Sequence, residues 1–176
     1  MGYELYIRLL SDAVLEEKGV KKEVLPEAQI DIRADAHIPE SYVAGAPARM
    51  ELYKKISAIR CAADVEDIRE ECRDRYGRLP RAVERLLRVA LARALAARMG
   101  MPRVEHNGNE LRFLLTEVDL ASWSVLFAER KDLSFRKSSP PAVLCRLAAG
   151  DDPCERAAAL LSRLWEVKSE NEEKTE

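Results

Sequence analysis

The segment that most constrains the fold lies in the middle of the chain, between Pro80 and Gly100. Proline is favoured in the first turn of a helix and glycine just after its end, so these residues bracket a predicted helix over residues 80–99. Apolar residues recur along it at helical spacing, the pattern of a helix that packs one face against a core. They are Val83, Leu86, Leu87, Ala90, Leu91 and Ala94.

Strands are predicted after this helix. Asn107-Gly108-Asn109 is a hairpin signal, because Asn and Gly tolerate positive φ, and it separates predicted strands over residues 103–106 and 110–115. Further strands are predicted over residues 28–36, 133–136 and 142–146. Further helices are predicted over residues 3–17, from Pro47 to about Cys61, from an N-cap at Asp64 to Gly77, from a cap at Asp119 through Arg130, and from Asp152 and Pro153 onward.

These elements do not alternate regularly as strand, helix, strand, so a doubly wound parallel sheet is not expected. The prediction is an α+β fold in which several helices flank a small antiparallel sheet. The first helix begins at residue 2 or 3 without a cap. We therefore expect the chain to start inside a longer element, as an N-terminal linker helix.

Composition narrows the classes of function. The formal net charge is −2, from 29 Lys and Arg against 31 Asp and Glu, so no bulk attraction to nucleic acid or to an anionic membrane is expected. None of the four cysteines lies in a C-x-x-C pair, so a structural zinc site is not expected. No signal peptide or membrane-length apolar run is visible, which predicts reduced thiols and a cytoplasmic location.

Signatures of catalysis are missing from the sequence. No glycine pair has G-x-G spacing, and no P-loop, G-x-S-x-G elbow or H-E-x-x-H helix occurs. His37 abuts a predicted strand end and His106 a hairpin turn, so each reads as an exposed or satisfied polar residue. The sequence therefore predicts no enzyme, no catalytic residue, no metal site and no cofactor.

A row of acids marks the predicted helix that begins near Asp64. Its apolar residues fall on one face, and the opposite face carries carboxylates at positions i, i+3, i+4 and i+7. These carboxylates are Asp67, Glu70, Glu71 and Asp74. The row is either a solvated face or a docking surface for a basic partner, whose arginines would bind carboxylates bidentately.

The next helix has the opposite charge. Residues 78–99 hold six arginines against one acid, Glu84. Three of them lie roughly opposite the apolar face: Arg81, Arg85 and Arg88. These arginines could be solvated, could pair with the acidic helix, or could form a secondary basic surface that binds phosphates. No aromatic residues lie between them, so the stacking platform typical of nucleic-acid sites is missing. An accessory nucleic-acid-binding domain that uses this helix is the alternative function.

Several motifs in the first hundred residues fall in the order and spacing of a known family. They are Gly2-Tyr3-Glu4-Leu5-Tyr6, Gln29-Ile30-Asp31-Ile32 leading to Ile38-Pro39, Arg49-x-Glu51-Leu52-Tyr53-Lys54-Lys55-Ile56, Glu71-x-x-Asp74-Arg75-Tyr76-Gly77-x-x-Pro80, and Met99-Gly100-Met101. On these motifs the chain resembles the C-terminal regulatory domain of the bacterial transcription-repair coupling factor family. Beyond residue 105 the resemblance rests on topology.

The resemblance implies a role inside a larger protein. Members of the family are ATP-driven double-stranded DNA translocases that remove stalled RNA polymerase and recruit the nucleotide-excision repair protein UvrA. Their last domain is non-catalytic and docks on the UvrB-like N-terminal module of the same protein. This docking masks the surface that binds UvrA. DNA would be contacted only through the absent motor, and no membrane is involved.

The resemblance also sets boundaries and site residues. It implies a linker helix from the motor over residues 1–20 and the regulatory domain over residues 21–168. The charged residues after Lys168 predict a flexible acidic tail over residues 169–176. The acidic contacts of the family fall in the Glu-x-x-Asp motif, so Glu71 and Asp74 carry over, and helical geometry extends the surface to Asp67 and Glu70. Arg73 stands where the family tends to be apolar, and it is expected to weaken the negative field.

Overall fold

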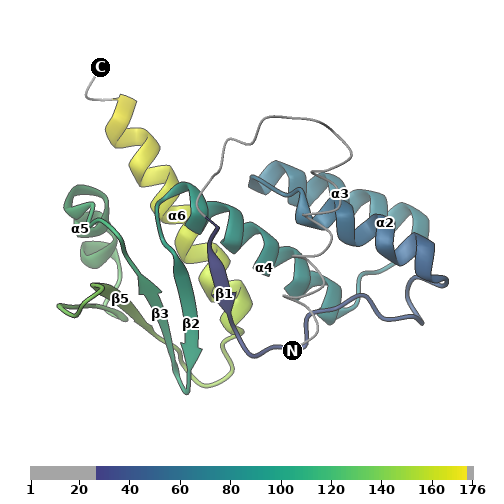
Figure 1. The fold of residues 1–176 in the computed structure, drawn as a ribbon, viewed down its shortest axis with the longest axis horizontal. Coiled ribbons are helices and arrows are strands. Elements are labelled where there is room, and N and C mark those ends of the chain that lie inside the picture. The colour runs from purple at the N-terminus through teal and green to yellow at the C-terminus, as the bar shows by residue number, and fades with distance from the viewer. Residues whose placement is uncertain (1–26, 174–176) are drawn as a thin grey trace. The chain divides into compact units, whose positions relative to one another are not determined.

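The structure is a computed structural model that describes residues 27–173, whose elements are drawn in Figure 1. These residues divide into two compact units. In the described part of the chain, the first unit comprises residues 35–91 and the second comprises residues 27–34 and 92–173. The predicted helix over residues 3–17 lies outside the described residues.

The first unit is helical. It contains α2 (Ala46–Ser57), α3 (Ala62–Tyr76) and the first part of α4 (Arg81–Arg98), and Figure 1 shows α2 and α3 side by side. Its core is formed by fully buried side chains from these helices and from the loop before α2, namely Val43, Ile56, Val65, Cys72, Val83, Leu86 and Leu87. The phenol of Tyr42 closes the loop onto the end of α3, because it donates to the carbonyl oxygens of Cys72 and Gly77 at 3.2 and 3.1 Å.

The start of α3 differs from the prediction. The sequence places the N-cap at Asp64, whereas Cys61 is the N-cap and Asp64 is the third helical residue. From there its carboxylate accepts the backbone N–H groups of Arg60 and Cys61 at 2.7 and 3.1 Å, which completes a capping box. A capping carboxylate two or three residues inside the helix has the same sequence signature as an N-cap, so spacing alone misplaces the start.

The second unit is built on a sheet of five strands in the order β1-β2-β3-β5-β4. The strands are β1 (Gln29–Asp31), β2 (Arg103–Asn107), β3 (Glu110–Leu114), β4 (Leu133–Arg136) and β5 (Ala142–Arg146). The α+β class is confirmed, but the sheet is mixed, because β1 pairs parallel to β2 while all other pairs are antiparallel. Alternation of apolar residues specifies which face of a strand is buried and leaves its direction undetermined.

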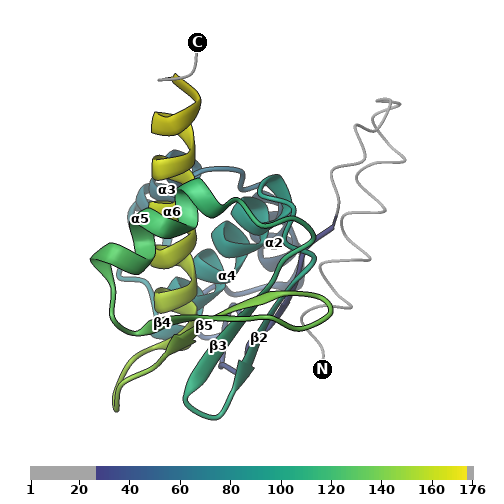
Figure 2. The ribbon, with the colours of Figure 1, turned by 90° about the vertical axis from the view of Figure 1, so that its left-hand side faces the viewer.

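This unit also contains the last part of α4 and two further helices, α5 (Leu120–Glu129) and α6 (Pro153–Glu173), which pack together (Figure 2). The predicted cap at Asp119 is confirmed, since its carboxylate accepts the Ser122 N–H at 3.1 Å. Helix α6 continues past Lys168, where the sequence predicts a flexible tail. The amide of Asn171 donates to the Ser122 hydroxyl at 3.4 Å, and this contact ties the last turns of α6 to α5.

A carboxylate at the start of β4 joins three elements of the unit. Asp132 accepts two hydrogen bonds from Arg130, at 3.1 and 2.7 Å, and one from Arg156 of α6 at 2.8 Å. The thiol of Cys145 on β5 lies 3.4 Å from the same carboxylate. The Arg130 guanidinium is the main cause that lowers the pKa of Asp132 to about 2.

Removal of this carboxylate should destabilise the protein. Hydrogen bonds to charged groups contribute about 1.5–3 kcal/mol, so we expect Asp132→Ala to lower the free energy of unfolding by about that amount. The pKa of Asp132 is depressed in the folded state. Its contribution to the free energy of unfolding is therefore fully present above pH 3.8, the ordinary pKa of the group, and is lost as the pH falls through about 2. Urea unfolding from pH 7 to pH 2 should therefore show a shallower acid decline for Asp132→Asn than for the wild type. An equal decline in both would contradict this assignment.

Candidate functional site

Helix α3 presents a row of carboxylates to solvent. Val65, Ile68 and Cys72 are buried on its inner face. On its outer face Asp67, Glu70 and Asp74 are exposed, and among residues 27–173 no basic group lies within ion-pair distance of them. Spacing of three to four residues places them along one side of the helix. We call these three residues the acidic row.

Glu71, the fourth predicted site residue, is placed differently. Its side chain is only 32% exposed, and it accepts hydrogen bonds from Lys55 of α2 at 2.6 and 2.8 Å and from Arg75 at 2.7 Å. These two cations, Lys55 first, lower the pKa of Glu71 below its ordinary value. The structure therefore joins Glu71 to an internal ion-pair cluster, and within residues 27–173 the other three predicted acids form no ion pair.

Glu51 of α2 belongs to the same cluster, and sequence reasoning did not single it out as a functional residue. Its carboxylate lies 3.6 Å from the Lys55 ammonium and 4.0 Å from the Arg75 guanidinium. The cluster thus sets two carboxylates against two cations and is balanced in charge. It fastens α3 to α2 without neutralising the acidic row.

Arg69 secures the opposite flank of α3. Its guanidinium is 11% exposed and donates to Glu84 of α4 through Nε and Nη2, at 3.1 and 3.0 Å, and it also pairs with Glu66. The single acid of the arginine-rich helix is therefore bound by an arginine of the acidic helix. Arg73 and Arg75 of α3 are both exposed, but Arg75 pairs with Glu71, whereas Arg73 forms no ion pair with another residue among residues 27–173.

The predicted secondary basic surface does not form a uniform exposed stripe. Arg81 is exposed, whereas Arg85 and Arg88 are half-buried. The charge of Arg88 contributes to the lowered pKa of Glu66 on α3, so part of this surface acts on the neighbouring acidic helix. Arg81 and Arg85 also take part in polar interactions.

The described residues offer little for catalysis. Burial raises the pKa of the Cys72 and Cys145 thiols to about 11, so both stay protonated near neutral pH. His37 pairs with Asp35 at 2.7 Å, and the His106 ring lies 2.9 Å from the Gly108 carbonyl oxygen. Within residues 27–173 no group of His, Cys, Asp and Glu could bind a metal ion, and no helix is long and apolar enough to cross a membrane.

Comparisons with known proteins agree on one family. The family model described as the TRCF domain matches residues 32–123. Transcription-repair-coupling factors from Staphylococcus epidermidis RP62A and Staphylococcus aureus USA300 are 29% identical over 118 residues and 32% identical over 110 residues. These matches cover 66% and 61% of this chain but only 10% and 9% of the relatives, so the chain spans about a tenth of their length.

The fold has a solved counterpart. A crystal structure described as the C-terminal domain of transcription-repair coupling factor superposes with a TM-score of 0.71 at 22% sequence identity, over 82% of this chain and 95% of that one. The family match covers more than half of the chain and includes all of α3 with its acidic row. The chain belongs to the TRCF domain family.

Proposed function

We propose that this chain is a non-catalytic regulatory domain at the C-terminus of a transcription-repair coupling factor, and that it docks on another part of the same protein. The docking partner is the UvrB-like N-terminal module, and the contact masks the surface of that module that binds UvrA. The ATP-driven DNA translocase activity and the contact with RNA polymerase belong to the rest of the full-length protein. The proposal requires no cofactor and no metal.

The acidic row is the observation that supports this proposal. Asp67, Glu70 and Asp74 lie along one side of a helix that is fixed on both flanks, and the described residues supply no ion pair for any of them. Carboxylates presented in this way attract arginine side chains, which bind them with two parallel hydrogen bonds. Because the groups are exposed, the contact is expected to be modest in strength and sensitive to salt, as a reversible clamp requires.

Glu71 has a second role in this proposal. Lys55 and Arg75 occupy its carboxylate, so a basic partner would have to compete with them for it. We infer that Glu71 contributes chiefly by fixing α3 against α2, while Asp74 contacts the partner directly.

Charge reversal on α3 should abolish docking. We expect Glu71→Lys with Asp74→Lys to remove calorimetric binding to the UvrB-like module at low salt. Asp74→Lys alone should weaken binding by about tenfold, since reversal removes an attraction and adds a repulsion, each of ~0.5–1 kcal/mol at an exposed site.

The single variant leaves the ion pairs of Glu71 intact, so it separates docking from stability. Glu155→Lys makes the same charge change at an exposed acid on α6 and serves as the matched control. Wild-type affinity in Asp67→Lys/Glu70→Lys/Asp74→Lys would refute the proposed surface.

Removal of Arg73 should have the opposite effect. This exposed cation stands between Glu71 and Asp74 in sequence and reduces the negative field of the row. We expect Arg73→Gln to raise affinity for the UvrB-like module about threefold, with a steeper dependence on salt. Titration calorimetry at two ionic strengths measures both effects, and a loss of affinity would show that Arg73 itself binds the partner.

A gel-shift assay tests the alternative function. If α4 bound nucleic acid, Arg81→Ala/Arg85→Ala/Arg88→Ala would abolish a salt-sensitive shift of duplex DNA. Because Arg85 and Arg88 are half-buried and the chain is net negative, we expect no such shift from the wild-type chain. A shift that this triple variant removes would favour the nucleic-acid function.

A further inference from the structure

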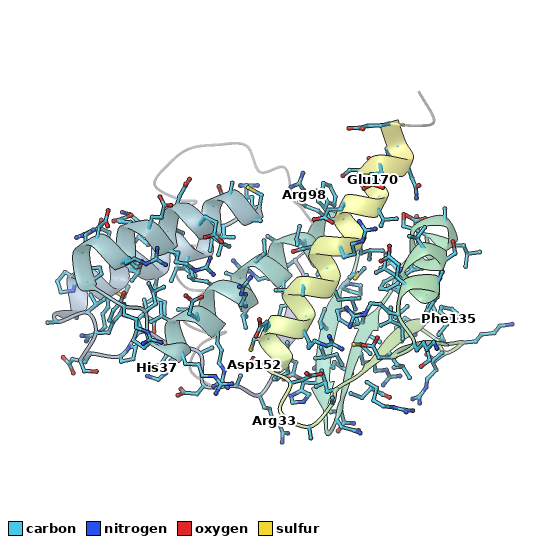
Figure 3. All side chains as sticks on the ribbon, turned by 180° about the vertical axis from the view of Figure 1, so that it is seen from behind. Arg33, His37, Arg98, Phe135, Asp152 and Glu170 are labelled. Atoms are coloured by element: carbon cyan, nitrogen blue, oxygen red, sulfur yellow. The ribbon has the colours of Figure 1, made fainter. Side chains whose placement is uncertain are left out.

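One row of side chains crosses all five strands on the core face of the sheet and ends abruptly. The cross-strand register aligns Ile30, Val104, Phe113, Val143 and Phe135 in that order. The first four are at most 8% exposed, whereas Phe135 on β4 is 45% exposed. Figure 3 shows Phe135 at the margin of the structure, away from α6. The apolar layer of the sheet is therefore uncovered at this one edge.

The backbone of Phe135 also lies at the free edge. The Arg146 N–H donates to the Asp132 carbonyl oxygen at 2.9 Å, so these two residues form a hydrogen-bonded pair. Bonded and non-bonded pairs alternate in an antiparallel ladder, so Ser134 also bonds to β5, whereas Leu133 and Phe135 do not. The N–H and C=O groups of Leu133 and Phe135 therefore point away from β5. No other described strand pairs with that side of β4.

This edge is basic. Lys131, Arg136 and Lys137 are exposed, and none of the three forms an ion pair with another residue of the described chain. Arg130 does not add to them, because Asp132 binds it. Within residues 27–173, three cations without an ion pair thus lie in β4 or next to its ends, close in sequence to Phe135 and the open peptide groups.

The edge is also fixed in place. Asp132 ties the start of β4 to Arg156 of α6, and the remainder of the strand pairs with β5. A binding partner would therefore lose little free energy in ordering β4, and most of the ordering cost would fall on the partner itself.

From these observations we propose that the β4 edge binds an extended acidic segment of another protein as an added strand. Peptide groups of that segment pair with Leu133 and Phe135, and an apolar side chain covers the Phe135 ring. The alternate carboxylates lie on the opposite face of the added strand, which is the face of Arg136, while Lys131 and Lys137 flank β4 and add to the attraction of the acidic segment. A second copy of this chain is a poor occupant, because two such edges would bring like charges together. The proposal is independent of the acidic row, which lies in the other unit.

Binding of short peptides tests the proposal directly. The probes are fluorescein-labelled peptides of about eight residues, a usual strand length, in which Glu alternates with Val or Phe. We expect a saturable change in anisotropy with the full chain, and affinity at least about tenfold above that of the matching Lys peptides. Added salt should weaken the binding.

Backbone pairing is tested by N-methylation of the best Glu peptide. Methyl groups on every second amide remove the donors of one edge of the peptide strand, and methyl groups on the other amides remove those of the opposite edge. We expect one of the two patterns to abolish binding and the other to preserve it. Equal affinity of both methylated peptides would overturn the added-strand geometry.

Protein variants locate the site. Phe135→Ser and the double variant Arg136→Glu/Lys137→Glu should each weaken binding by about tenfold or more. The double variant leaves the apolar row intact, so it remains informative if Phe135→Ser is unstable. Leu120→Ser, at the other large apolar residue that is exposed among residues 27–173, and Arg78→Glu should bind as the wild type does.

Three further results would overturn the proposal. They are the absence of saturable binding by every Glu peptide, equal binding by the Lys peptides, and wild-type affinity in both edge variants. Sedimentation of the free chain adds a fourth, since self-association that Phe135→Ser removes would make a second copy the occupant of the edge.

Discussion

The rotational setting of α3 determines what the first unit offers to a partner. Two polar contacts fix it, one on each flank: Lys55 binds Glu71 from α2, and Arg69 binds Glu84 of α4. The buried side chains of Val65, Ile68 and Cys72 also hold the helix in this orientation, because they pack in the core. A helix advances about 100° per residue, so a turn of one position would move the acidic row towards the core and expose apolar side chains. Desolvation of unpaired carboxylates would make that arrangement costly.

The internal ion pairs decide which charges remain available. Glu71 and Glu84 accept hydrogen bonds from cations on neighbouring helices, Lys55 of α2 and Arg69 of α3, and Glu51 of α2 lies 4.0 Å from Arg75 of α3. Asp67, Glu70 and Asp74 also lie on α3, but they extend away from the neighbouring helices. Surface charge therefore follows from the packing of helices, and the net charge of −2 conceals an acidic row in one unit and a basic strand edge in the other.

Local patterns predicted most of the elements, because their causes lie within a few residues. The hairpin around Asn107-Gly108-Asn109 and the cap at Asp119 depend on turn and cap chemistry that is written into adjacent positions. The parallel pairing of β1 with β2 joins residues 29–31 to residues 103–105, and nothing in either strand encodes it. Glu71 pairs with Arg75 at i+4, which helical spacing allows, but its contact with Lys55 could not be predicted, since Lys55 lies 16 residues away on another helix. Helical spacing predicted four equivalent acids, and the tertiary contacts made one of them structural.

The two candidate surfaces differ in what would make them specific. The acidic row is an arrangement of exposed charges on a rigid helix, so its affinity depends on ionic strength and tolerates small shifts of the partner. The β4 edge combines fixed peptide groups with the phenyl ring of Phe135. A shift of an added strand by one residue would move its apolar side chains to the opposite face, away from that ring, so only registers that differ by two residues can cover it. Charge alone would draw an acidic segment to the edge, but only a segment with the correct alternation would both pair with the backbone and cover Phe135. The first surface thus suits a contact that opens and closes within one protein, and the second suits the selection of one sequence among many acidic ones.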